Sequence, residues 1–341
     1  MSALAPSPAV LVVDDERGVR EVVARWLTSG GYDVRTAENA DEALQGVHKS
    51  APAVALCDIR MPGHDGLWLV RQIRYSAPET AVVMATAVQD ANSAITSLRE
   101  GVVDYLTKPF GRDRLRESVS RAVEWHESAR DSRRWREALA SDVDARRLRL
   151  ASAFESGPID SDAALDDLLV RLFTSAGDAY AHAYRVAALA VGIGRALALD
   201  EAELEVIERA ALLHDVGKLA MPEAVLRKPA PLTREEQDLV RRHPAIAAEA
   251  IRAFPYLAPA AELVRDVHER MDGLGYPSGV RAGDVALGAR IIAVADAYDT
   301  MTRSRVFRDA LAPGEALLEV ERCAGAQFDP LIVEAFRRYV E

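Results

Sequence analysis

The sequence has few cysteines, no long apolar run and no excess of basic residues. Its two cysteines, Cys57 and Cys323, stand far apart among 341 residues, which predicts reduced thiols rather than a disulfide framework. No run approaches the roughly 18 apolar residues of a membrane span, and the N-terminal segment lacks the basic and apolar regions of a signal peptide. We therefore expect a cytoplasmic chain that does not interact with membranes.

Acidic residues outnumber basic ones by 53 to 42, so the net charge is -11. Nonspecific binding to nucleic acid needs a basic surface that displaces counterions, and the chain shows no basic recognition helix. DNA is therefore excluded as an expected partner, and a nucleotide ligand would have to meet locally placed cations. The length suggests two domains of ordinary size.

An adjacent histidine and aspartate, His214 and Asp215, follow an apolar run at residues 207–213. The i, i+3, i+4 spacing of that run predicts a helix with one buried face. A buried charge is costly unless it is paired or bound to metal, and imidazole with carboxylate suits Fe, Mn or Zn. The pair is therefore a candidate metal site at the inner end of a helix.

Further candidate ligands lie on both sides of this pair. Asp178 and His182 stand four residues apart in a predicted helix, so both should emerge on one face. His243, His268 and Asp296 follow downstream. Because the pattern after residue 160 is almost wholly helical, apart from a glycine-rich loop at 272–288, we expect an all-α bundle with these side chains on facing helices.

Residues 160–341 resemble an HD-GYP domain. The resemblance rests on four blocks: His-Asp-Val-Gly-Lys at 214–218, Asp-Gly-Leu-Gly-Tyr-Pro at 272–277, Arg-His-Pro at 242–244 and Ala-Gln-Phe-Asp-Pro at 326–330. It implies hydrolysis of the bacterial second messenger cyclic di-GMP to linear pGpG and, in some members, on to GMP. It also implies that the loop around Tyr276 contacts signalling proteins such as diguanylate cyclases.

Within this resemblance we expect two divalent cations, with Fe or Mn favoured, that share Asp215. The remaining ligands would be His182, His214 and Asp296 for one cation, and His243 and His268 for the other. Lys218, one turn beyond His214, could reach a phosphate oxygen and act with His214 and Asp215 in catalysis. Arg305 and Arg308 match the family positions that hold the nucleotide, and arginine suits that role because its planar fork binds phosphate or guanine.

Two positions depart from the family pattern. Val267 stands where members usually carry the first of two histidines, and valine has no lone pair for a metal. Asp178 replaces the glutamate of members that hold three metals, so two metals are expected at most. Two hypotheses therefore stay open: a metal-dependent cyclic di-GMP phosphodiesterase, and a degenerate output domain that binds nucleotide or protein without turnover.

The first 120 residues alternate short β-rich runs with amphipathic helices. Strands are predicted near residues 10–13, 33–35, 54–57, 82–85 and 104–106. This alternation predicts an α/β fold with a doubly wound, parallel, five-stranded sheet, whose site lies at the carboxyl ends of the strands.

Polar residues fall at those strand ends: Asp14, Asp15, Asp58, Thr86 and Lys108. Converging carboxylates invite a hard cation such as Mg²⁺, and Asp58 could attack a phosphoryl group while Lys108 neutralises its charge. With Lys108-Pro109-Phe110, this set resembles the receiver domain of response regulators.

The receiver resemblance implies a role for each of these residues. Asp14 and Asp15 would bind Mg²⁺, and Asp58 would be phosphorylated by a sensor histidine kinase. Thr86 and Lys108 would contact the phosphoryl oxygens, Tyr105 would act as an aromatic switch, and Lys108-Pro109 would be a cis peptide.

Residues 112–154 are charge-rich and read as one long helix or two in series. An apolar seam with a 3.5-residue repeat runs through Ala122, Trp125, Ala129, Leu139, Val143 and Leu150. A parallel homodimer and a solvated linker helix both fit this pattern. We expect a receiver domain at 1–123, a helical linker at 124–159 and an HD-GYP domain at 160–341.

Overall fold

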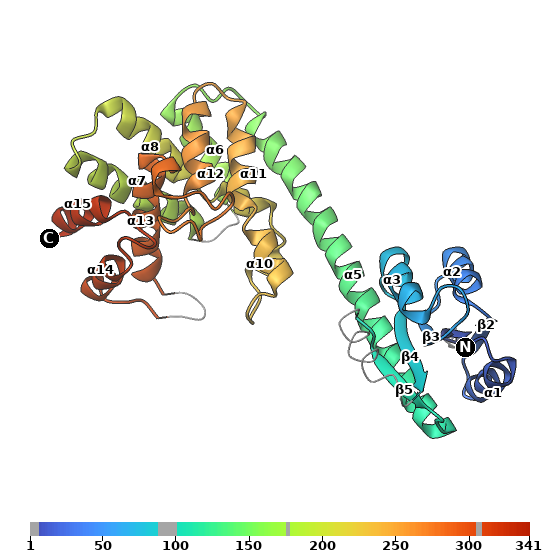
Figure 1. Ribbon diagram of the computed structural model, residues 1–341. Helices are drawn as coiled ribbons and strands as arrows, with labels where there is room; N and C mark the ends of the chain where they lie inside the picture. The colour runs from blue at the N-terminus through green and yellow to red at the C-terminus, as the bar shows by residue number, and fades with distance from the viewer. Residues whose placement is uncertain (1–6, 88–100, 175–177, 305–308) are drawn as a thin grey trace. The chain divides into compact units, whose positions relative to one another are not determined.

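The structure, a computed structural model, describes residues 7–87, 101–174, 178–304 and 309–341. The chain forms two compact units, Met1–Glu137 and Ala138–Glu341, and each is described by itself. The division falls inside one long helix, α5 (Arg112–Phe154), which Figure 1 shows in green. The sequence left open one long helix or two in series over these residues, and the structure has one helix.

The N-terminal unit contains five parallel strands in the order β2-β1-β3-β4-β5. The strands are β1 (Ala9–Val13), β2 (Asp33–Ala37), β3 (Val54–Asp58), β4 (Ala81–Ala87) and β5 (Asp104–Lys108). β3 is buried along its whole length, as expected for a parallel strand covered on both faces. The predicted doubly wound α/β fold is confirmed.

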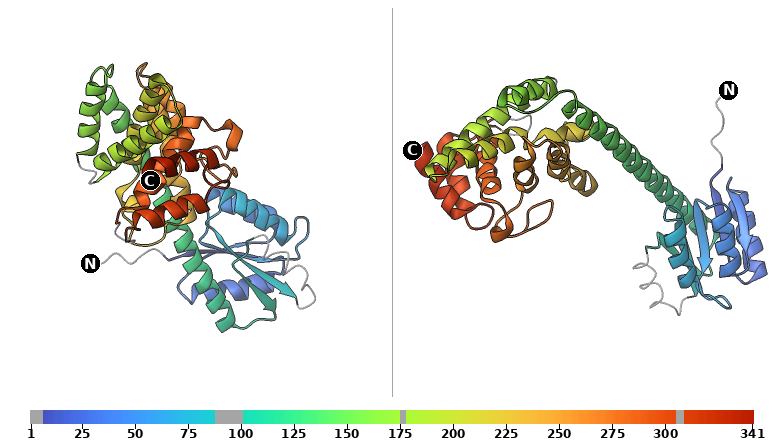
Figure 2. Two further views of the ribbon diagram at one scale, coloured as in Figure 1. Left: turned by 90° about the vertical axis from the view of Figure 1, so that its left-hand side faces the viewer. Right: turned by 90° about the horizontal axis from the view of Figure 1, so that it is seen from above.

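Within residues 7–87 and 101–137, the helices that cover this sheet are α1 (Arg17–Thr28), α2 (Ala40–Lys49), α3 (Gly66–Ser76) and the first part of α5. Leu27 of α1 and Leu115 of α5 share a buried cluster with Val12 of β1. Leu69 of α3 joins a second cluster with Leu11, which faces the other way along β1. The helices therefore lie on both faces of the sheet, as the views in Figure 2 show.

The described part of the C-terminal unit is built from helices. They are α6 (Asp162–Phe173), α7 (Ala179–Ala196), α8 (Glu201–Leu213), α9 (Glu223–Leu226), α10 (Arg234–Val240), α11 (His243–Arg252), α12 (Ala261–Asp266), α13 (Leu287–Met301), α14 (Pro313–Arg322) and α15 (Pro330–Val340), with short 3₁₀ turns η1 (Val216–Ala220), η2 (Ala258–Ala260) and η3 (Ala282–Asp284). Helix α7 packs against α6, α8, α13 and α15. The predicted all-α architecture is confirmed.

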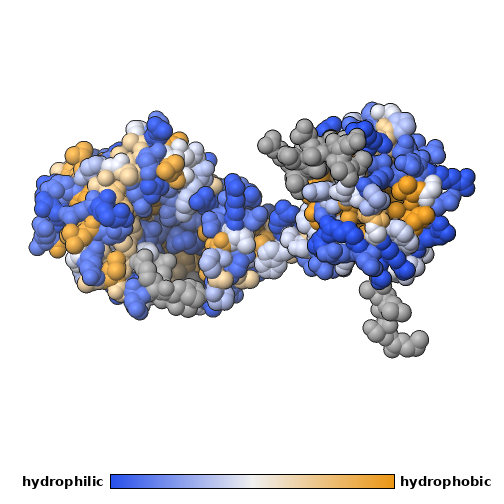
Figure 3. All heavy atoms as spheres, turned by 60° about the horizontal axis from the view of Figure 1, so that its bottom comes forward, coloured by the Kyte–Doolittle hydropathy of each residue, from blue (hydrophilic) through white to orange (hydrophobic). Residues whose placement is uncertain are grey.

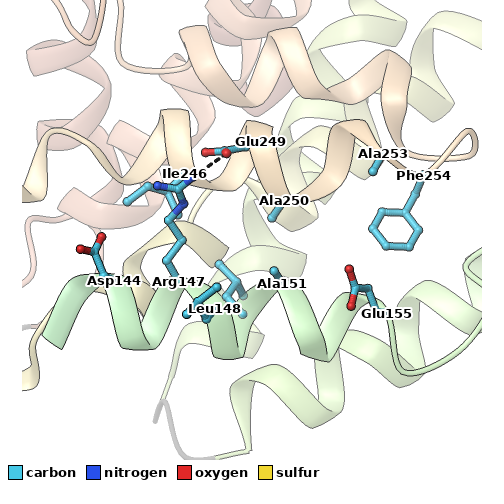
Figure 4. Close-up of a pocket in the computed structure, with 11 residues that line it drawn as sticks. Asp144, Arg147, Leu148, Ala151, Glu155, Ile246, Glu249, Ala250, Ala253 and Phe254 are labelled. Carbon is cyan, nitrogen blue, oxygen red and sulfur yellow. Dashed lines mark hydrogen bonds and ion pairs between the residues drawn. The ribbon is translucent and has the colours of Figure 1, made fainter. Parts of the chain in front are cut away.

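The last turns of α5 belong to the core of the C-terminal unit. Val143, Leu150 and Phe154 join its buried apolar cluster. Figure 4 shows α5 beside α11, where Arg147 and Glu249 form an ion pair at 2.6 Å. The chain itself therefore buries part of the predicted seam, and a dimer through these positions would have to compete with that packing.

Figure 3 shows one face of each unit. Hydrophilic side chains dominate it, with smaller hydrophobic patches between them. Among the residues that the structure describes, no helix is long and apolar enough to cross a membrane.

Leu150 and Leu148 offer a matched test of how the end of α5 packs. Leu150 is 4% exposed, whereas Leu148, two residues earlier on the same helix, is 72% exposed. We expect Leu150→Ala to destabilise the C-terminal unit by roughly 2–5 kcal/mol, because it leaves a cavity. Leu148→Ala should change stability by less than about 0.5 kcal/mol. Thermal denaturation followed by circular dichroism would measure both, and equal effects would contradict the packing described above.

Candidate functional site

Six predicted ligands of the C-terminal unit come from five helices and the turns that follow them. His182 lies in the first turn of α7, His214 and Asp215 between α8 and η1, His243 at the start of α11, His268 just after α12, and Asp296 on α13. His214 and Asp215, called the HD pair below, thus follow directly after a buried helix, as the apolar spacing predicts.

Local sequence sets the position of the HD pair. A reciprocal capping box between Asp200 and Glu203 starts α8, and the helix ends at Leu213. Gly217 then allows η1 to approach α11, because a Cβ at this position would lie 1.9 Å from the carbonyl oxygen of His243. Asp215 and His243 are therefore held on neighbouring backbone segments.

His182, His214 and Asp215 form a first group whose ligand atoms all lie within 4.8 Å of one another. His182 Nε2 is 3.2 Å from Asp296 Oδ1 and 4.0 Å from Asp215 Oδ2. His214 Nε2 is 3.6 Å from Asp215 Oδ1 and 3.9 Å from Asp296 Oδ1. The structure thus brings together the four residues that the sequence assigns to one cation.

Asp215, His243 and His268 form a second group within the same limit of 4.8 Å. His243 Nε2 lies 3.5 Å from Asp215 Oδ1 and 3.2 Å from His268 Nε2. The two groups share Asp215, which is the arrangement expected of a carboxylate that bridges two cations.

The hydrogen bonds of His214 and His243 fix the direction of their lone pairs. Nδ1 of His214 donates to the carbonyl of Ala211 at 2.7 Å, and Nδ1 of His243 donates to Val240 at 2.8 Å. In both rings Nε2 therefore carries the lone pair. Among the described residues, His214 Nε2 and Asp215 Oδ1 are buried without a hydrogen-bond partner. Facing lone pairs of this kind are costly unless a cation lies between them, so the donor set fits a divalent metal.

A neighbouring ammonium group keeps Asp215 ionised. Burial alone would raise the pKa of Asp215, but Lys218 holds it well below its usual range. Lys218 Nζ donates to Asp215 Oδ2 at 2.6 Å. Burial lowers the pKa of His268 to about 3, so this imidazole is neutral. Burial alone would lower the pKa of His182, but its hydrogen bonds to Asp296 and Asp299 raise it to about 9. Metal ligands must be deprotonated, so a cation would displace a proton from His182.

Asp299 is a site residue that sequence reasoning missed. Its Oδ2 accepts from His182 Nδ1 at 2.7 Å, and Arg185 Nε donates to its Oδ1 at 2.7 Å. Arg185 also donates to Asp178, whose side chain is 71% exposed and belongs to neither ligand group. The i, i+3 spacing of Asp296 and Asp299 on α13 was the available signal.

The glycine-rich loop closes over His268. The Tyr276 ring stacks on the His268 ring, with centroids 4.9 Å apart. The backbone N–H of Tyr276 donates to the backbone carbonyl of His268. Glu269, also missed from sequence, accepts from Ser278 and Gly279 at 2.6 and 3.1 Å. Val267 is buried and lines the same cavity as His268. The predicted nucleotide-binding residues Arg305 and Arg308 lie outside the described residues.

The predicted residues of the N-terminal unit gather at the carboxyl edge of the sheet. Asp14, Asp15 and Asp58 offer carboxylate oxygens within 4.8 Å of one another. Lys108 Nζ donates to Asp14 Oδ2 at 2.7 Å and to Asp58 Oδ2 at 2.9 Å. Thr86 is buried at the end of β4. This acidic group therefore fits a Mg²⁺ site beside a potential nucleophile.

Two further features of this edge bear on the sequence predictions. Tyr105 is 39% exposed on β5, and Lys108-Pro109 is a cis peptide, as predicted. Burial raises the pKa of Asp58, with Asp14 adding to the effect and Lys108 opposing it. A cation at this edge would favour the charged carboxylate that phosphoryl transfer requires.

Comparisons with known proteins assign both units. A family described as response regulator receiver domain matches residues 10–120, and one described as HD domain matches residues 170–332. A cyclic di-GMP phosphodiesterase of Thermotoga maritima is 29% identical, over 96% of this chain and 89% of that protein. The cyclic di-GMP phosphodiesterase response regulator RpfG of Xanthomonas campestris is 30% identical, over 96% and 87%. A 3'3'-cGAMP-specific phosphodiesterase of Vibrio cholerae is 33% identical, over 58% and 44%.

A receiver with an acidic group at its sheet edge, joined to a histidine–aspartate cluster in a helical unit, defines a response regulator with an output domain. The chain belongs to the response regulators that combine a receiver domain with an HD domain. Its relatives across 96% of the chain include proteins named as cyclic di-GMP phosphodiesterases.

Asp299 gives a prediction about metal affinity. We expect Asp299→Ala to weaken Mn²⁺ binding roughly 10- to 100-fold, because His182 loses the acceptor that orients its ring. Asp299→Asn keeps an acceptor oxygen and should lose less. Titration of the metal-free protein with Mn²⁺ would measure this, and affinity equal to wild type in a folded Asp299→Ala protein would contradict the orienting role.

Proposed function

We propose that the HD domain hydrolyses cyclic di-GMP to pGpG and that phosphorylation of the receiver at Asp58 controls this activity. The observation that supports the hydrolase most strongly is the buried Asp215 carboxylate, which is shared by two groups of imidazoles and leaves Oδ1 without a partner. Relatives named for this activity support the choice of substrate.

In this proposal His182, His214 and Asp296 would hold one divalent cation and His243 and His268 a second, with Asp215 available to both and Fe or Mn favoured. When bound, the two cations would polarise a phosphate and make water a stronger nucleophile. Asp299 orients His182, and the backbone carbonyls of Ala211 and Val240 orient His214 and His243. Lys218 neutralises Asp215 Oδ2 and, with a side chain 36% exposed, can also reach a substrate phosphate.

A second candidate function is nucleotide or protein binding without turnover. The specific observation in its favour is Val267, a buried aliphatic side chain in the cavity that His268 and Asp296 also line. A binding module would hold fewer than two metals and form no pGpG. Metal content and product formation measured on the same preparation separate the two functions.

Removing either member of the HD pair tests the hydrolase directly. We expect His214→Ala and Asp215→Ala to lower kcat roughly 100-fold or more, because each removes a proposed metal ligand. Asp238→Ala, which changes an exposed aspartate on α10, is the control and should keep full activity. The assay is chromatographic detection of pGpG with added Mn²⁺. Turnover retained by either HD variant with metal still bound would mean that the site lies elsewhere.

The receiver proposal has a separate test. Wild-type protein incubated with acetyl phosphate should incorporate one acid-stable, hydroxylamine-labile phosphoryl group, because an acyl phosphate forms on Asp58. Asp58→Asn should incorporate none, whereas Asp33→Asn, at an exposed position on β2, should behave like wild type. The rate of cyclic di-GMP hydrolysis should respond to beryllofluoride in wild type and not in Asp58→Asn. An identical response in both proteins would show that Asp58 is not the control point.

A further inference from the structure

A cavity of about 380 Å³ lies beside the two groups of candidate metal ligands that share Asp215, together called the cluster. His268 and Asp296 line it, together with residues of the glycine-rich loop and the end of α10. A substrate that reaches the cluster would occupy this space, so the charges along its wall bear on what can bind.

Most charged groups of this wall are neutralised within the protein. Asp296 faces His182 at 3.2 Å. Arg270 donates to Asp272 at 2.6 Å and to Gln327 at 2.9 Å. Glu269 Oε1 accepts two backbone N–H groups of the loop, and its Oε2 is buried without a hydrogen-bond partner among the described residues. Arg270, the cation of this group, is paired and is therefore not free for an anionic ligand.

Arg241 differs from them. It is exposed at the end of α10 and lines the cavity. Its guanidinium carbon lies 5.7 Å from the centre of the Tyr276 ring, a contact that favours a cation over the ring face. Among the described residues, no carboxylate pairs with it. Because Tyr276 also stacks on His268, one ring connects the cluster with this unpaired cation.

We infer that Arg241 binds a phosphate group of the nucleotide, namely the phosphate that is not attacked at the cluster. This rests on the proposed function, since a cyclic dinucleotide carries two phosphodiesters and only one can lie against Asp215. A chain of net charge -11 needs a local cation for the second. The planar fork of arginine donates two parallel hydrogen bonds to a phosphate, and Tyr276 limits the positions that the side chain can take.

The test compares three variants of the full chain with wild type: Arg241→Ala, Arg241→Lys and Arg242→Ala. Arg242 is the matched control, because it is the adjacent exposed arginine and does not line the cavity. Calorimetry on the metal-free proteins, which cannot hydrolyse the nucleotide, gives the Kd for cyclic di-GMP. Hydrolysis of bis(p-nitrophenyl) phosphate by the Mn²⁺-loaded proteins reports on the cluster alone, because this ester has a single phosphate.

We expect Arg241→Ala to weaken cyclic di-GMP binding roughly 10- to 100-fold, the loss typical of a charged hydrogen bond. Arg241→Lys should lose less, and Arg242→Ala should match wild type. Hydrolysis of the single-phosphate ester should be unchanged in all three. Wild-type affinity in Arg241→Ala, or an equal loss in Arg242→Ala, would overturn the inference.

Failure of the proposed function gives a different result. A wild-type protein that binds cyclic di-GMP but forms no pGpG would refute the hydrolase, while the comparison of Kd values would still decide the role of Arg241. A wild-type protein that does not bind cyclic di-GMP at all would overturn the inference as well.

Discussion

The Asp215 carboxylate lies among His182, His214 and His243, and its Oδ1 has no hydrogen-bond partner among the described residues. Removing a carboxylate from water costs several kcal/mol unless opposite charge replaces the lost hydration. Lys218 supplies part of that charge, at Oδ2. The remaining oxygen and the inward lone pairs of the imidazoles form a donor set that fits a cation. Helices α7, α8, α11 and α13 bring these atoms together.

The receiver meets a related constraint in another way. Asp14 and Asp58 converge at the edge of a parallel sheet, where Lys108 bridges them and an added cation would complete the neutralisation. Both units therefore gather carboxylates that the protein alone does not fully neutralise. The carboxylates of the receiver edge are of the ligand type that suits Mg²⁺, whereas imidazole, the main ligand type of the HD domain cluster, suits metals such as Fe or Zn.

Features that depend on local order could be predicted from the residues themselves. The grouping of distant ligands such as His243 and Asp296 was predicted through the family resemblance, and other distant contacts were missed. Strand ends and the run before His214 are local, so the sheet, its acidic edge and the HD pair could be predicted. Asp299 meets His182 only when α13 packs on α7. Asp178 precedes α7 instead of lying within it, and its side chain turns to Arg185. Arg241 gains its environment from Tyr276, which is 35 residues away in sequence.

The most direct test of the shared carboxylate is anomalous diffraction from crystals of anaerobically purified full-length protein, measured at the Fe and Mn absorption edges. We expect two peaks of anomalous difference density in the HD domain, both within bonding distance of Asp215 and separated by about 3.5–4 Å. One peak that Asp215 does not contact, or no peak in a protein that hydrolyses cyclic di-GMP, would contradict it.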